Sequence, residues 1–109
     1  MKNKIIPYSR QFVDEEDQKA VVRVLKSDYL TQGPEVRKFE NTLSKFCNVN
    51  YSIALNSATS ALHSSCVALG IGNNDLVWTV PITFVATANA ALYCGATIDF
   101  VDIDSKTWC

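Results

Sequence analysis

The stretch from Asn56 to His63, with the sequence NSATSALH, combines residue types that suit the binding of an anion. It lies between an alternating segment, Tyr51–Leu55, and a helical pattern that continues to Leu69. A helix that opens on small, hydroxyl-bearing residues presents free backbone N–H groups and the positive end of its dipole. These features suit a phosphate, but Ser and Thr also open helices simply as caps. The turn therefore predicts either a phosphate site or a capped helix without a ligand.

The elements around this turn predict an α/β fold with a mostly parallel sheet flanked by helices. Ligands of such sheets bind at the carboxyl ends of the strands, so we expect the Asn56–Thr59 turn and the Thr79–Phe84 loop to line one cleft. From Tyr51 onward the expected elements are a strand at 51–55, a helix at 57–69, a strand at 76–79, a helix at 83–94 and a strand at 97–101.

The N-terminal part predicts two helices after an extended arm at residues 7–13. Asp14 is the expected cap of the first helix, which runs to about Lys26. Pro34 suits the first position of the second helix. Along this second helix the apolar residues recur at helical spacing. They are Val36, Phe39, Leu43 and Phe46.

Composition is that of an ordinary soluble protein: 109 residues, 48% hydrophobic, 19% charged and a net charge of −1. This balance gives no reason to expect nucleic acid or an anionic membrane as a partner. No segment approaches the ~20 apolar residues of a membrane span, and the apolar run at the N-terminus is too short for a signal peptide, so we expect a cytoplasmic protein. The four cysteines lack metal-site spacing and are expected to be reduced, buried and free of metal.

Five stretches, which together cover almost the whole chain, resemble the DegT/StrS family of sugar aminotransferases, which use pyridoxal 5'-phosphate (PLP). Within that family the resemblance is strongest to the nucleotide-sugar 4-aminotransferases of pseudaminic-acid biosynthesis. The stretches are IPYS at 6–9, LTQGP at 30–34, NSATSALH at 56–63, WTVPITFVA at 78–86, and CGA at 94–96 followed by FVDID at 100–104.

The resemblance implies the large domain of the type I aminotransferase fold, incomplete in this chain, and a homodimer when the protein is full length. It implies an arm, first helix and substrate loop at residues 1–34 and the start of the PLP-binding domain at 35–109. The implied reaction moves an amino group from glutamate to the C4 keto group of a UDP-linked 4-keto-6-deoxy N-acetylated sugar.

Particular residues receive roles through this resemblance. Backbone amides of Ser57, Ala58 and Thr59 are expected to hold the cofactor phosphate, and Phe84 to stack on the cofactor ring. The alternatives are a plain helix cap and a core aromatic. For His63 a structural role is expected. The residues expected to contact the nucleotide sugar are Tyr8, Asp28, Tyr29, Leu30 and Thr31.

No catalytic residue is expected in this chain. In the family, the ring-nitrogen Asp and the Schiff-base lysine both lie downstream of any position that matches Cys109. We therefore expect a fragment that is inactive alone. Alternatives are a PLP-dependent sugar dehydratase of the same family and a truncated gene product without a catalytic role. A dinucleotide-binding oxidoreductase is disfavoured because no G-x-G-x-x-G follows a strand.

Overall fold

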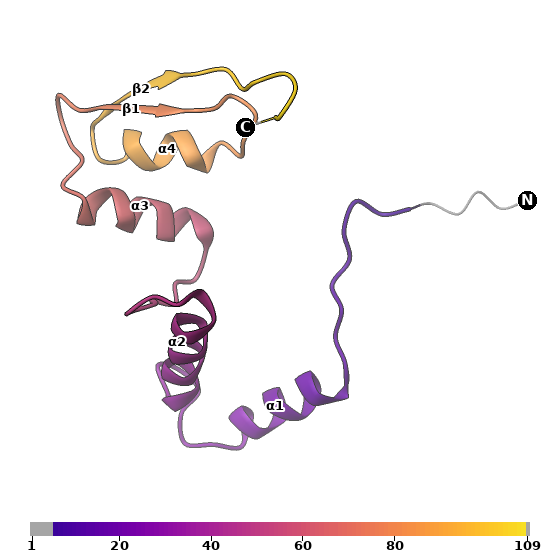
Figure 1. Cartoon of the computed structure of the whole chain (residues 1–109). Coiled ribbons are helices and arrows are strands. Elements are labelled where there is room, and N and C mark those ends of the chain that lie inside the picture. Colours follow the sequence, from indigo (N-terminus) through magenta and orange to yellow (C-terminus); the bar gives the residue numbers. More distant parts are fainter. Residues whose placement is uncertain (1–5, 109) are drawn as a thin grey trace, which may run out of the picture. The chain divides into compact units, whose positions relative to one another are not determined.

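The computed structural model describes residues 6–108, which divide into two compact units at the junction of Ala54 and Leu55. The first unit holds two helices, and the second holds two helices and two strands (Figure 1). The domain boundary expected between residues 34 and 35 falls inside the first unit and stays a prediction. Within residues 6–108, no helix combines the length and the apolar character needed to cross a membrane.

Helix α1, Glu15–Leu25, begins with a reciprocal side-chain cap. Asp14 Oδ1 accepts hydrogen bonds from Glu16 N at 2.9 Å and from Asp17 N at 3.0 Å. In return, Asp17 Oδ2 accepts one from Asp14 N at 3.1 Å. These pairs satisfy backbone donors that the helix leaves free, and the acids oppose the positive end of its dipole. The predicted cap at Asp14 is confirmed.

Helix α2, Pro34–Cys47, begins with the proline that the sequence predicted at its first position. The ring fixes φ near the helical value, and the missing N–H is one that a first turn leaves unpaired in any case. Asn48 ends the helix in the left-handed conformation, at φ 53°. Beyond it, Glu40 Oε1 accepts a hydrogen bond from Ala54 N at 2.9 Å, which ties the following segment back to the helix.

Gly33, the N-cap of α2, lies too close to the preceding loop to carry a side chain. A Cβ at Gly33 would approach the Tyr29 Cβ to 2.6 Å, so the loop would have to move. We expect Gly33→Ala to lower the free energy of unfolding by about 1–3 kcal/mol, the usual cost of overpacking. Urea denaturation measures this value. Gly72→Ala is the control, because its Cβ would meet only the Cys94 carbonyl oxygen at an ordinary 3.8 Å. Equal losses in both variants would contradict the explanation.

The second unit contains the α/β part of the chain. Strands β1, Leu76–Thr79, and β2, Thr97–Phe100, pair in parallel, with Leu76 opposite Thr97. Helix α3 spans Ala58–Ala68, and helix α4, Ala86–Leu92, connects the two strands. The parallel sheet predicted from the alternation of strands and helices is confirmed for this pair.

Two expected elements differ in the structure. Residues 51–55 form no strand, although their side chains alternate, because a strand also needs ladder hydrogen bonds to a neighbour and the described sheet contains only β1 and β2. The helix expected from Thr83 begins at Ala86 instead. Local hydrogen bonds keep the segment before this helix in a turn conformation. Thr83 N donates to the Pro81 carbonyl oxygen at 3.1 Å, and the Thr83 and Thr87 hydroxyls are 2.9 Å apart.

The core of the second unit is built from small side chains. Helix α4 packs against α3 and against both strands. Its contact face consists of alanines, and a further alanine precedes β2. The large side chains of the strands lie outside this core, since Trp78 is 67% exposed and Phe100 55% exposed. The buried residues are Ala86, Ala90, Ala91 and Ala96.

Candidate functional site

The N-terminus of α3 presents unpaired backbone donors. Ser57 is its N-cap, and the Ser57 Oγ accepts a hydrogen bond from Ser60 N at 3.1 Å. The Ser57 carbonyl oxygen accepts the next one, from Ala61 N at 3.0 Å. Among the hydrogen bonds of residues 6–108, Ala58 N and Thr59 N donate none. Two adjacent N–H groups at the positive end of a helix therefore remain available to an anion.

The charge at this terminus also favours an anion. The first turn of α3 holds no acidic residue, whereas the first turn of α1 holds Glu15, Glu16 and Asp17. In α1 the acids occupy the donors and offset the dipole, while in α3 the dipole is left uncompensated. The residues at the start of α3 are short, so a phosphate group can approach the backbone. The residues present thus fit the phosphate site that the sequence predicted at Ser57, Ala58 and Thr59.

Phe84 lies in the loop between β1 and α4. Its side chain is 74% exposed in the described structure, and the choice between a stacking aromatic and a core aromatic stays a prediction. Its backbone is nevertheless held, because the Phe84 carbonyl oxygen accepts a hydrogen bond from Thr87 N at 3.0 Å. An exposed ring on an anchored backbone suits a contact with a flat ligand.

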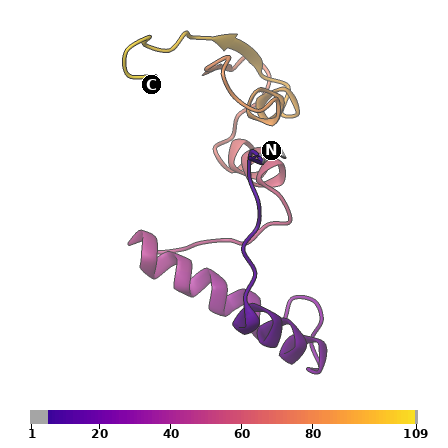
Figure 2. The same cartoon turned by 90° about the vertical axis from the view of Figure 1, so that its right-hand side faces the viewer.

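The predicted phosphate turn and the Phe84 loop lie at one end of the second unit. Figure 1 shows α3 and α4 running in the same direction, with both N-termini on the side where the strands have their carboxyl ends. Figure 2, turned by 90°, shows the two helices again side by side, as their packing requires. This is the end of a parallel sheet where ligands bind.

The residues expected to contact the sugar nucleotide belong to the first unit. Tyr8 is fully exposed in the segment before α1, which contains no helix or strand. Residues 28–31 form the loop between α1 and α2. There the Ser27 Oγ donates to the Val24 carbonyl oxygen at 2.8 Å and accepts from Tyr29 N at 3.3 Å. Substrate contact by Tyr8, Asp28, Tyr29, Leu30 and Thr31 stays a prediction.

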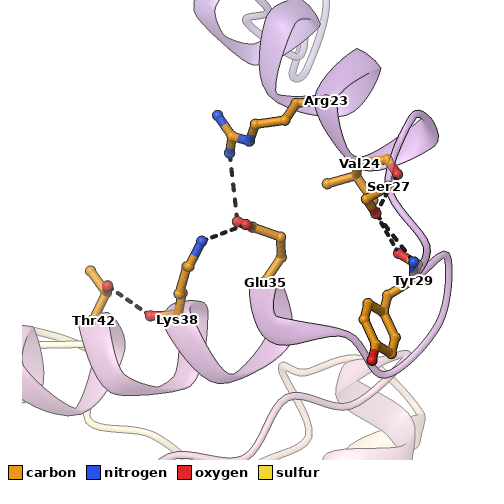
Figure 3. A network of polar contacts seen from close by, with 7 residues as sticks. All are labelled: Arg23, Val24, Ser27, Tyr29, Glu35, Lys38 and Thr42. Atoms are coloured by element: carbon orange, nitrogen blue, oxygen red, sulfur yellow. Dashed lines mark hydrogen bonds and ion pairs between the residues drawn. The ribbon is translucent and has the colours of Figure 1, made fainter.

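An ion-pair network links the two helices beside this loop (Figure 3). Glu35 pairs with Lys38 Nζ at 2.7 Å and with Arg23 Nη2 at 3.6 Å. The hydrogen bond from Lys38, joined by the charges of Lys38 and Arg23, lowers the pKa of Glu35 from its ordinary value of 4.5. All three side chains are well exposed, so the network is a modest contributor to stability.

The network gives a pH dependence with a definite sign. Because the folded-state pKa of Glu35 is lowered, its contribution is present above pH 4.5 and is lost as the pH falls through the folded value. We expect Glu35→Gln to lower the thermal midpoint slightly at neutral pH and not at all in acid. Melting curves across this pH range measure the difference. It should also shrink at about 1 M salt, where the screening length is about 3 Å. A difference that persists in acid would contradict the assignment.

Other polar residues of the sequence have structural contacts. The rings of His63 and Tyr93 meet edge to face, with centroids 5.5 Å apart, in agreement with a structural role. Asp104 Oδ1 accepts hydrogen bonds from Thr107 N and Lys106 N, both at 2.8 Å, which lower the pKa of Asp104. Within residues 6–108 no group of three or more His, Cys, Asp or Glu side chains is arranged to hold a metal ion.

The expectation that the cysteines are buried is wrong where the structure describes them. Cys47 is exposed, and both Cys66 and Cys94 are half-buried. Their thiols are free. Short side chains at helix ends reach the surface wherever nothing packs over them. Cys109 lies outside the described residues.

Sequence reasoning missed Ser60 as part of the α3 terminus. The Ser57 Oγ donates a hydrogen bond to the Ser60 Oγ at 3.0 Å, so the two hydroxyls form a pair on the first turn. The spacing of the two serines could have predicted this pair, because residues three positions apart are neighbours on a helix.

Comparison with known proteins gives a family match over most of the chain. The model of the DegT/DnrJ/EryC1/StrS aminotransferase family matches residues 11–109. A similar relative is the UDP-4-amino-4,6-dideoxy-N-acetyl-beta-L-altrosamine transaminase of Campylobacter jejuni strain 81-176, 48% identical over 99 residues, which are 91% of this chain and 26% of the relative. The UDP-4-amino-4-deoxy-L-arabinose–oxoglutarate aminotransferase of Shewanella sediminis is 36% identical over 105 residues, 96% of this chain and 27% of that one.

Solved structures similar to this chain also include sugar aminotransferases. A candidate sugar aminotransferase of Streptococcus pneumoniae, Spr1654, has been solved in its PLP form. It superposes with a TM-score of 0.90 at 33% identity, over 94% of this chain and 26% of that one. The present chain thus spans about a quarter of the length of the proteins that it matches.

Proposed function

Because the chain belongs to the DegT/DnrJ/EryC1/StrS aminotransferase family, whose members depend on PLP, we propose that it is the N-terminal part of a nucleotide-sugar 4-aminotransferase. The proposed reaction transfers an amino group from glutamate to the C4 keto group of a UDP-linked 4-keto-6-deoxy N-acetylated sugar. The observation that supports the cofactor part best is the acid-free N-terminus of α3 with its two unpaired N–H groups.

In this proposal each residue performs a simple task. Ala58 N and Thr59 N donate hydrogen bonds to the cofactor phosphate, and the α3 dipole favours its negative charge. The exposed ring of Phe84 lies against the flat face of the cofactor and fixes its plane. Bound PLP supplies an electron sink for the carbanion that forms when a substrate loses a proton. Tyr8 and the loop at residues 28–31 bind the nucleotide sugar.

The identity of the amino acceptor rests on the relatives. The Campylobacter and Shewanella proteins both have names that describe a UDP sugar with an amino group at C4. The Campylobacter name adds the 6-deoxy, N-acetylated sugar, and that relative shares 48% of the compared residues. We therefore propose the same class of acceptor here, with a homodimer as the working assembly.

A graft tests this proposal. Replacing the matching 99 residues of the Campylobacter transaminase by those of this chain keeps the remaining three quarters of a related enzyme. We expect the grafted enzyme to bind PLP and to convert glutamate into 2-oxoglutarate when a UDP-linked 4-keto-6-deoxy N-acetylated sugar is present. A folded graft that binds PLP but aminates only UDP-linked keto sugars without the N-acetyl group would contradict the acceptor. A folded graft without PLP would contradict the cofactor site.

The graft does not separate the aminotransferase from the sugar dehydratase of the same family, because that choice depends on one residue after the matched segment. In the aminotransferases a lysine holds the cofactor, and in the dehydratases a histidine takes its place. The nucleotide sequence beyond the codon for Cys109 discriminates between them. A downstream lysine supports the proposed reaction, a histidine supports the dehydratase, and a stop codon supports a truncated product that is inactive alone.

A further inference from the structure

Cys66 and Cys94 lie at the same end of the α3–α4 pair. Cys66 is in the last turn of α3, and Cys94 follows α4 by two residues. Both helices close with a left-handed glycine, Gly70 at φ 74° and Gly95 at φ 84°. At the end of α3, the Cys66 carbonyl oxygen accepts a hydrogen bond from Ile71 N at 3.0 Å, which fixes the backbone there.

Neighbouring contacts fix the separation of the two helices at this level. The rings of His63 and Tyr93 pack edge to face at 5.5 Å. His63 lies one helical turn before Cys66, and Tyr93 immediately precedes Cys94. The chain after α3 also passes close to Cys94, because a Cβ on Gly72 would lie 3.8 Å from the Cys94 carbonyl oxygen. Both cysteines are therefore held on backbone that packing and hydrogen bonds define.

The pKa of the Cys94 thiol reflects its surroundings at this level of the helix pair. Burial raises the pKa of the Cys94 thiol, and the adjacent Cys66 sulfur raises it further. This effect agrees with the packing of α3 against α4 and the contact of His63 with Tyr93, which bring the two cysteines to the same level of the helix pair. Both side chains are only half-buried, so a small reagent reaches them, whereas Cys47 is exposed and belongs to the first unit.

We propose that Cys66 and Cys94 form a reversible dithiol–disulfide pair that is oxidised by low-molecular-weight disulfides. This site is independent of the proposed function, since it uses neither the α3 N-terminus nor Phe84. The disulfide would join the ends of α3 and α4 that lie opposite the candidate phosphate turn. It would lock their packing without covering that turn.

The chemistry balances as two thiol–disulfide exchanges. The Cys66 thiolate attacks one sulfur of the reagent, its S–S bond breaks, and the first small thiolate leaves. The Cys94 thiol loses its proton to water and attacks the Cys66 sulfur of the mixed disulfide, and the second small thiolate leaves. The two protein thiols are oxidised, and the reagent is reduced to two thiols. Because the pKa of Cys94 is raised, the second step should accelerate as the pH increases.

The test uses the full chain with Cys47→Ser and Cys109→Ser, which leaves only the proposed pair. After incubation with oxidised glutathione and an acid quench, we expect intact-mass spectrometry to show the loss of two hydrogens and no attached glutathione. Dithiothreitol should restore both thiols. A stable glutathione adduct on either cysteine, or two thiols that remain free, would overturn the proposal.

The matched control carries Cys66→Ser and Cys109→Ser, and so keeps two thiols, Cys47 and Cys94. We expect it to accumulate glutathione adducts, because Cys94 has lost the partner with which it forms the proposed disulfide. Peptide mapping of the unsubstituted chain gives a second measurement that does not depend on the variants. In buffer the Cys66–Cys94 disulfide should be favoured at least about tenfold over its level in concentrated urea, where a flexible loop supplies only an effective concentration of about 1 mM. Equal levels in both solvents would also overturn the proposal.

Discussion

Replacing Ser57 by Asp should weaken PLP binding by the grafted enzyme about 100-fold. An Asp caps a helix as well as a Ser, so α3 should keep its N-terminus. The added carboxylate would, however, face the phosphate across the Ala58 and Thr59 N–H groups. Two like charges about 4 Å apart repel by about 4 kcal/mol near a protein surface, and a solvent-exposed terminus reduces this to about 2–3 kcal/mol. Titration with PLP, followed by absorbance, measures the loss.

Ser57→Asn is the matched control for this substitution. Asn has nearly the same size and the same capping ability, but no charge. We expect it to change the PLP affinity only a few-fold. If the Asp and Asn variants bound PLP equally, the start of α3 would not be the phosphate site. Inorganic phosphate as a competitor of PLP gives a second readout, and it should lose its effect in the Asp variant alone.

A second large effect is expected for Ala90→Leu, which should lower the free energy of unfolding by about 3 kcal/mol. Ala90 is 1% exposed, on the helix that packs against α3 and both strands. The fully buried residues of the described structure are all alanines, so this core leaves little room for a larger side chain. The extra methyl groups would force α4 away from the sheet. Urea denaturation followed by far-UV circular dichroism measures the change.

Ala88→Leu is the control, because it adds the same atoms to the same helix at a half-buried position. Ala88→Leu should lower the free energy of unfolding clearly less than Ala90→Leu does. Moving α4 would also move the loop that contains Phe84, so the Ala90 variant of the grafted enzyme should bind PLP less well. Equal destabilisation by both variants would show that α4 does not pack through its alanine face.

The sequence predicted those elements whose signals are local. Leu76–Thr79 was predicted within its observed bounds, because a turn precedes it and Pro81 follows it. The cap at Asp14 and the first-turn proline at Pro34 are equally local, since each depends on one residue's hydrogen bonds or φ. The strand expected at 51–55 failed for the opposite reason. Alternation describes which side chains share a face, whereas pairing depends on what lies next to them in space.

The residues of the candidate site also differ in whether a local sequence signal predicts them. Ser57, Ala58 and Thr59 could be found from sequence because a strand-like segment followed by small hydroxyl residues marks a helix start. The exposure of Phe84 could not be found, because an aromatic beside a helix is more often part of the core. The proposed Cys66–Cys94 pair also has no signal in the sequence, since 28 positions separate the two residues. Only the packing of α3 against α4 brings them together.

The parallel pairing of β1 with β2 has a consequence for the order in which the second unit forms. Residues 80–96 lie between the strands, so this pairing cannot begin as a hairpin that zips from a tight turn. The ladder bonds, such as Thr97 N to the Asp75 carbonyl oxygen at 2.9 Å, close only after the intervening chain has folded back. Helix α4 is that intervening chain, and its alanines supply the contacts that make the closure favourable. The strands and α4 should therefore form and open as one cooperative segment, and their amide hydrogens should exchange with solvent at a common rate.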